Sequence, residues 1–261
     1  MKRKFFKLGL FLTLGLTTTV FYSCEKNDNG DESSNVSKII ATNVVNGSPE
    51  IVTVKAEVSW YNGNNYEYYT IAEAPYKDNG FTLELPATVP AQYLDSIMEN
   101  GDEVFIKGIT VSDKTVIGTS FECFDAYDKN DDSIGGLYYL SVDDNGNGSE
   151  AWWFYVDKEV TINGQNKQEY EDFNEVDISI FNNLTLKKGW NIIYLTVTHV
   201  YNQSTQIDTY TNTFSNQKPS GVTLKWYFDS FNSQNYAATL KSTNSFSKGK
   251  SFFSKVKQIK Y

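Results

Sequence analysis

The chain has 261 residues, with 23 basic and 32 acidic side chains, one histidine and a formal net charge of −9. Aromatic residues make up 15% of it, whereas it contains only five prolines and two cysteines. Nucleic-acid binding is excluded as a function class, because so acidic a protein is repelled at long range by a polyanion.

The first 23 residues have the organisation of a secretory signal peptide. Four basic residues precede an uncharged apolar run over residues 8–21, which is too short to be a stable membrane anchor. Small Ser23 then precedes Cys24. This order resembles the signal peptide and lipobox of bacterial lipoproteins, which implies cleavage before Cys24 and attachment of lipid to that residue. The resemblance therefore predicts a lipid anchor in the bacterial outer membrane.

Residues 24–38 are expected to form a flexible tether, because they are polar and acidic with very few apolar side chains. The acidic stretch after Cys24 also resembles the surface-export signal of lipoproteins from Bacteroidota-type bacteria, which implies display on the cell surface. Without the signal peptide, the chain holds 19 basic and 32 acidic residues, a balance of −13. Residues 229–261 hold six lysines and one aspartate, or +5, which leaves −18 on residues 24–228.

Short runs of Val, Ile, Thr, Tyr and Phe, separated by Asn, Asp and Gly, predict an all-β protein. One short helix is expected over residues 91–100, where Tyr93, Leu94 and Ile97 have helical spacing. The expected strands cover residues 51–61, 66–74, 81–86, 103–111, 115–127, 134–142, 149–156, 159–162, 176–186, 190–201, 207–214 and 222–228.

This number of strands predicts an antiparallel β-sandwich, either one large sandwich or two in tandem. We divide the body into an N-terminal half, residues 39–111, and a C-terminal half, residues 112–228. The stretch IAEAPYKDNGFTLELP, residues 71–86, resembles the hairpin of transthyretin-like and carboxypeptidase-regulatory-like β-sandwiches. Residues 187–201 and 222–228 are similar to the closing strands of Bacteroidota-type surface lipoproteins. The basic residues 229–261 lack clean periodicity and are expected to be a disordered or loosely docked extension.

The sequence contains no recognisable catalytic motif. His199 is the only histidine, so a multi-histidine metal site is excluded. There is no G-x-S-x-G, H-E-x-x-H or phosphate-binding loop. We expect His199 to be an ordinary strand residue, Cys123 to be a buried inert thiol, and the protein to have neither cofactor nor catalytic activity. A glycosidase stays open as a third alternative, because its two carboxylates need no motif.

Two acidic turns resemble calcium loops in part. Asp143, Asn145 and Asn147 match the first oxygen positions of an EF-type loop, but its twelfth position is Phe154 instead of a glutamate. Residues 128–132 have similar spacing and the same defect. Since Asn, Asp and Gly are also the residues that turn a chain between strands, we expect turns instead of metal sites. A looser, lectin-like calcium site stays open.

Aromatic residues give the best indication of a ligand. Trp60, Tyr68, Trp152 and Trp153 lie in strand-like runs with aromatic residues on both faces. An exposed ring beside polar side chains suits a sugar, although both faces can instead be buried in a core. We therefore expect a lipid-anchored binding or accessory protein whose partner is a glycan or another surface protein. The alternative is a structural, adhesin- or pilus-like assembly protein that pairs through an exposed edge strand.

Overall fold

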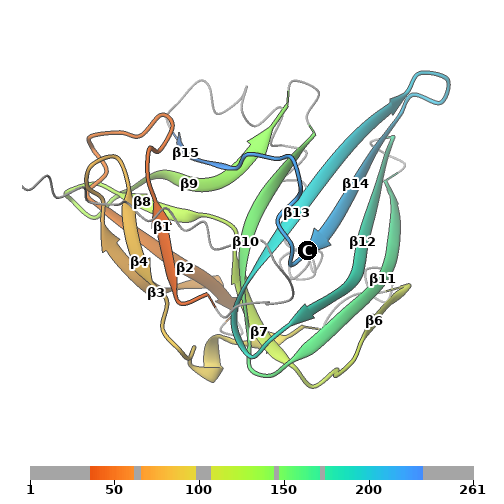
Figure 1. The fold of residues 1–261 in the computed structure, drawn as a ribbon, viewed down its shortest axis with the longest axis horizontal. Helices are drawn as coiled ribbons and strands as arrows, with labels where there is room; N and C mark the ends of the chain where they lie inside the picture. The colour runs from red at the N-terminus through yellow and green to blue at the C-terminus, as the bar shows by residue number, and fades with distance from the viewer. Residues whose placement is uncertain (1–35, 62–65, 98–106, 144–146, 171–173, 232–261) are drawn as a thin grey trace, which may run out of the picture. The chain divides into compact units, whose positions relative to one another are not determined.

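The computed structural model describes residues 36–61, 66–97, 107–143, 147–170 and 174–231 (Figure 1). The predicted signal peptide, Cys24, most of the tether and almost all of residues 229–261 therefore lie outside the described residues. The described part belongs to one compact unit. Its first strand begins at Lys38, which the sequence had placed at the end of the tether.

About 65% of the described chain is β-strand, as expected for an all-β protein, and in these ranges the only helical element is a 3₁₀ turn, η1 (Ala91–Tyr93). No helix among them is both long enough and apolar enough to cross a membrane. The strands are β1 (Lys38–Ala41), β2 (Thr53–Tyr61), β3 (Tyr66–Pro75), β4 (Phe81–Glu84), β5 (Asp95–Ser96), β6 (Ile109–Val111), β7 (Ile117–Phe121), β8 (Phe124–Tyr127), β9 (Ser133–Val142), β10 (Gly148–Val156), β11 (Val160–Tyr170), β12 (Glu175–Leu186), β13 (Gly189–Asn202), β14 (Ile207–Ser215) and β15 (Lys225–Ser230).

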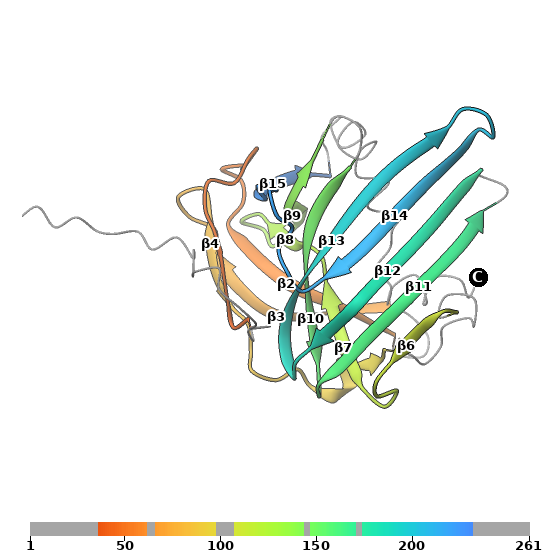
Figure 2. The same cartoon turned by 45° about the vertical axis from the view of Figure 1, so that its right-hand side comes forward.

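Thirteen of these strands form one sheet, and β1 and β4 pair separately. The main path runs β3-β2-β8-β9-β10-β13-β14-β12-β11-β6, while β15 pairs with β9 and β7 joins β10 to β5. The named strands pair in antiparallel fashion except for β12 and β14, which run parallel. Figure 2 shows β13, β14, β12 and β11 side by side. These features confirm the all-β, sandwich-like prediction.

The expected division at residue 111 has no counterpart in this sheet. Strand β6, at the end of the N-terminal half, pairs with β11 of the C-terminal half. Strand β2 likewise pairs with β8 across the same boundary. Strands from both halves therefore interleave in one structure.

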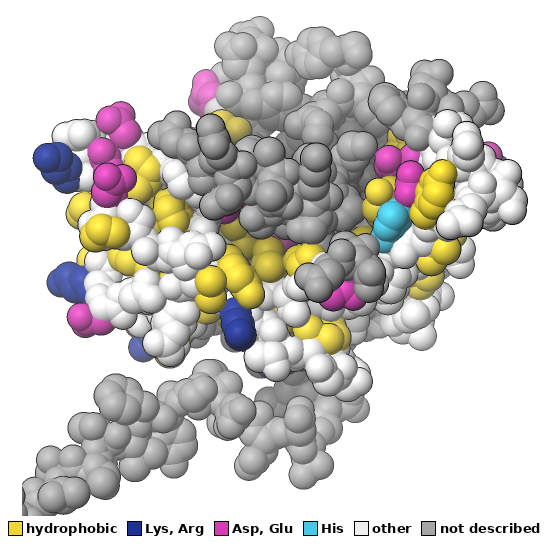
Figure 3. Space-filling view, turned by 90° about the horizontal axis from the view of Figure 1, so that it is seen from above, with side chains coloured by type: hydrophobic (Ala, Val, Ile, Leu, Met, Phe, Trp, Pro, Cys, Tyr) yellow, Lys and Arg dark blue, Asp and Glu magenta, His cyan; other side chains and the backbone are white. Residues whose placement is uncertain are grey.

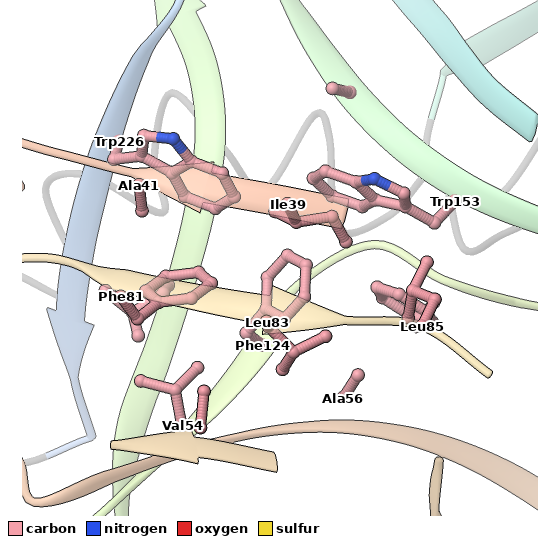
Figure 4. Packing of buried hydrophobic residues seen from close by; sticks show 14 of the residues in the cluster. Ile39, Ala41, Val54, Ala56, Phe81, Leu83, Leu85, Phe124, Trp153 and Trp226 are labelled. Atoms are coloured by element: carbon pink, nitrogen blue, oxygen red, sulfur yellow. The ribbon is translucent and has the colours of Figure 1, made fainter. Parts of the chain in front are cut away.

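A first core lies between the β1–β4 pair and one face of the large sheet (Figure 4). In β4 the alternating side chains of Phe81 and Leu83 point into this core. Aromatic rings fill its centre: the Phe124 and Trp153 centroids are 4.8 Å apart, and those of Phe81 and Trp226 are 5.2 Å apart. The β1–β4 pair is thus the second layer of the sandwich.

A second core lies on the opposite face of the large sheet. It joins Trp152 of β10 to Leu195 of β13, Phe214 of β14, Ile162 of β11 and Ile109 of β6. Because strands from β10 to the far edge at β6 contribute to one cluster, the sheet must curl with this face inside. We call it the concave face.

Residues 91–100 do not form the expected helix. After η1, Leu94 is extended, with φ −105° and ψ 135°. Asp95 and Ser96 then pair with β7, and Ile97 enters the second core at 5% exposure. Strand pairing and this burial therefore override a helical spacing of only three apolar side chains, and residues 98–100 lie outside the described chain.

Candidate functional site

The predicted platform of Trp152 and Trp153 is not exposed. The two side chains point to opposite faces of β10 and have exposures of 1% and 2%. Trp152 lies in the second core and Trp153 in the first. The prediction that these rings are open to a sugar is therefore wrong, because both faces of β10 are covered.

Trp60 and Tyr68 do not share a surface either. Trp60 lies opposite Glu67 in the β2–β3 register, whereas Tyr68 lies opposite Ser59. The two aromatic residues therefore point to opposite faces of the hairpin. Trp60 is half-buried, and its ring meets that of Tyr93 edge to face at 5.5 Å. Tyr68 is 74% exposed and stands apart from it.

The first calcium candidate has the hydrogen bonds of a turn. The backbone N–H of Asn147 donates to Asp143 Oδ1 at 2.9 Å, and Asn147 Nδ2 donates to Asp143 Oδ2 at 3.0 Å. Asn147 Oδ1 in turn accepts the backbone N–H of His199 at 2.8 Å. Asn145 lies outside the described residues, among which no group of three or more His, Cys, Asp or Glu side chains could hold a metal ion.

His199 has partners that the sequence did not reveal. Its Nε2 lies 2.6 Å from Asp208 Oδ1, and its ring stacks on that of Tyr210 with centroids 4.7 Å apart. The register of the β13–β14 hairpin causes this contact, because it sets His199 directly opposite Tyr210. The His199 and Asp208 side chains are 25% and 37% exposed. Figure 3 shows histidine and acidic side chains together on the surface.

His199 and Tyr210 belong to a wider polar surface on the concave side. Directly opposed residues point to the same face of a sheet, and one row runs Gln168, Asp177, Tyr210, His199 across β11, β12, β14 and β13. Neighbouring rows bring further polar side chains to this face. We call the set the polar face: Asn166, Gln168, Tyr170, Asp177, Ser179, His199, Asp208, Tyr210 and Asn212.

The tyrosines of the polar face remain protonated donors at neutral pH. Burial, followed by Asp177 and Glu175, raises the pKa of Tyr170 to about 12. Burial and the carboxylates of Asp208, Glu175 and Asp177 also raise the pKa of Tyr210. Asp177 itself is buried, with 7% exposure. The face thus offers hydroxyl donors beside carboxylate and amide acceptors.

A second set of acidic groups lies where the expected strand 115–127 breaks. Glu122 and Cys123 separate β7, which pairs with β10, from β8, which pairs with β2 and β9. Residues of β2, β8, β10 and β15 whose side chains face away from the first core add to this set. We call it the acidic band: Glu57, Glu122, Asp125, Glu150 and Asp229.

Burial makes the acidic band costly to ionise. It raises the pKa of Glu122 to about 7, and burial followed by Glu122 raises that of Glu150 well above its usual range. Burial and Glu57 raise the pKa of Asp125 to about 6, which Lys55 partly offsets. The Cys123 thiol is held protonated by burial and by these carboxylates, which agrees with an inert cysteine.

No family model, curated protein or solved structure matches this chain. A function must therefore be inferred from the polar face and the acidic band.

Proposed function

We propose that the protein is a lipid-anchored binding protein of the bacterial outer membrane, and that its polar face binds a glycan without catalysis. The observation that supports this most is the row of amide, carboxyl, phenol and imidazole groups across four adjacent strands. A sugar ring needs an apolar face to stack on and polar groups at its edge.

The stacked rings of His199 and Tyr210 would supply the planar surface for a sugar. Gln168 and Asp177, in the same row, would bond hydroxyl groups at its edge. Because Asp208 holds the imidazole at Nε2, the ring orientation is set before a ligand arrives. A preorganised ring of this kind lowers the entropic cost of binding.

The membrane part of the proposal depends on the order of basic, apolar and small residues before Cys24. A lipid at Cys24 would hold the binding body at the membrane, and the acidic residues that follow favour display on the outer surface. A location on the outer surface suits capture of a glycan from outside the cell.

Calorimetric titration of the full chain with a panel of polysaccharides tests the binding proposal. Saturable binding to one of them should weaken at least about tenfold in His199→Ala and Asp177→Asn, equivalent to about 1.4 kcal/mol each. Tyr68→Ser is the matched control, because this exposed side chain lies outside the polar face. Absence of binding across the panel, or binding that survives both substitutions, would overturn the proposal.

A second function, assembly through an edge strand, has one specific observation in its favour. Within the described chain, β3 pairs only with β2, which leaves its other edge open over ten residues. An open edge can pair with another chain. Tyr68→Lys should then reduce self-association in light scattering while glycan binding is unchanged, and a monomeric unaltered chain would exclude this function.

A further inference from the structure

Strand β12 has its polar and apolar residues on the opposite sides from those expected of a surface strand. Asp177 and Ser179 point to the concave face, whereas Val176, Ile178 and Ile180 point to the other face of the sheet. A strand with one solvated side normally places apolar residues inward and polar residues outward. Val176, Ile178 and Ile180 belong to neither of the two cores that the described residues form. The outward side of β12 therefore has the composition of a covered surface.

The neighbouring strands extend this apolar row into a regular surface. Nine directly opposed residues form three rows across β12, β14 and β13, and every one of them is β-branched. We call the set the β-branched face: Val176, Thr209 and Val200 in the first row, Ile178, Thr211 and Thr198 in the second, and Ile180, Thr213 and Thr196 in the third. Val200 is 63% exposed, and the other eight are at least partly open to solvent. Such side chains are stiff, so this surface has a fixed shape.

The β-branched face carries no net charge, although the protein is strongly acidic. Its border strand, β11, adds Lys167 opposite Ile178 and Glu169 opposite Val176. These two charges pair with each other, because Lys167 Nζ lies 2.5 Å from Glu169 Oε1. Two copies of a chain with a net charge of −9 repel at long range. Contact through this face brings no unpaired charge of one copy against the other, so the face suits a second copy.

The size of the face also suits a second copy. Neighbouring strands are about 4.8 Å apart, and successive residues on one face are about 6.7 Å apart. The β13–β14 pair adds one row at each end, with Asn202 opposite Ile207 and Tyr194 opposite Ser215. Together with β11, these rows cover roughly 500 Å² of each copy. Two copies then bury roughly 1,000 Å², the lower limit of a specific interface, which predicts a reversible dimer instead of an obligate one.

We propose that two copies of the chain pack their β-branched faces together, sheet against sheet. Packed sheets lie about 10 Å apart with their facing side chains interdigitated, and equal rows of Val, Ile and Thr let the same surface fit itself around a two-fold axis. The polar face is on the other side of the same strands, so it takes no part in the contact. The dimer therefore does not depend on glycan binding, and it uses a surface different from the open edge of β3.

Sedimentation equilibrium of the full chain over about 1–200 μM tests the dimer, because this range brackets the Kd that so small an interface supports. We expect a reversible monomer–dimer equilibrium that tightens as salt rises, since screening weakens the repulsion between two acidic copies. Ile178→Lys and Thr198→Lys should each raise the Kd at least about tenfold, because a buried ammonium group without a partner is costly.

Tyr68→Lys is the matched control, because it adds the same charge at an exposed position of β3 and should leave the Kd unchanged. Thr198 is exposed in the single chain, so Thr198→Lys still decides the question if circular dichroism shows that Ile178→Lys does not fold. A chain that stays monomeric up to about 200 μM would refute face-to-face packing and leave the face to a different partner. A dimer that survives Thr198→Lys, or one that only Tyr68→Lys dissociates, would refute it as well and assign association to another surface.

Discussion

Trp153 gives the sharpest test of the first core. Its side chain is 2% exposed, and its ring lies 5.5 Å from Phe121, 4.8 Å from Phe124 and 5.9 Å from Trp226. Truncating a buried tryptophan to alanine costs about 3–5 kcal/mol, so we expect Trp153→Ala to lower the free energy of unfolding by that amount. This is a large fraction of the stability of a typical domain.

Trp153→Phe should behave very differently. The indole N–H of Trp153 is buried without a partner, so phenylalanine removes an unmet donor worth about 1–3 kcal/mol. The smaller ring loses apolar contact worth roughly 1–2 kcal/mol. The two effects nearly cancel, and we expect Trp153→Phe to leave the free energy of unfolding within about 1 kcal/mol of the unaltered chain.

Urea unfolding followed by far-ultraviolet circular dichroism measures both variants without relying on tryptophan emission. Tyr68→Ala is the control and should stay within about 0.5 kcal/mol, because its side chain is 74% exposed. If Trp153→Phe proves as costly as Trp153→Ala, the expected cancellation is refuted, and either the indole N–H has a partner or the loss of ring stacking dominates.

Other changes test separate features. Gly135→Ala would place a Cβ 2.2 Å from Asp229 O, so it should separate β15 from β9 and lower the unfolding midpoint in urea. Cys24→Ser should move the protein from the membrane fraction to the soluble fraction in cell fractionation, and an unchanged distribution would refute lipid anchoring. In that variant, iodoacetamide should alkylate Cys123 at pH 8 at least about tenfold more slowly than in urea, because the raised pKa keeps the thiol protonated. Finally, the chain should lose stability as the pH rises from 4.5 to about 7, since folded Glu122 keeps a proton that the unfolded chain releases. Glu122→Gln should flatten this dependence, and identical pH profiles in the two chains would contradict the raised pKa of Glu122.

The strands were predictable wherever apolar and polar residues alternate. Residues 207–214 and β14 differ by one residue, and the Asp78–Asn79 turn has the positive φ angles, 52° and 57°, that its sequence favours. Strand β11 was expected to end at residue 162 but continues to Tyr170. One side of its second half faces solvent and the other forms the polar face. Neither side needs apolar residues, so no apolar alternation marks this half of the strand in the sequence.

The candidate site could not be found in the same way. His199 and Asp208 meet only because the β13–β14 hairpin sets their register, and no motif marks such a pair. The burial of Trp152 and Trp153 could not be predicted, because the sequence of a tryptophan pair is the same whether the two faces of its strand are covered or exposed. Their environment is decided by the β1–β4 layer and by the curl of the sheet, and both depend on contacts between residues far apart in sequence.

The position of β14 affects how the chain can assemble. Strands β12 and β13 are consecutive but do not pair, because β14 lies between them, parallel to one and antiparallel to the other. While the ribosome is still adding residues 207–215, both neighbours have an open edge that can pair with another nascent chain. Closure of the concave face is therefore a late step with high contact order, and premature termination before residue 207 leaves β12 paired only with β11 and β13 paired only with β10, each with one open edge.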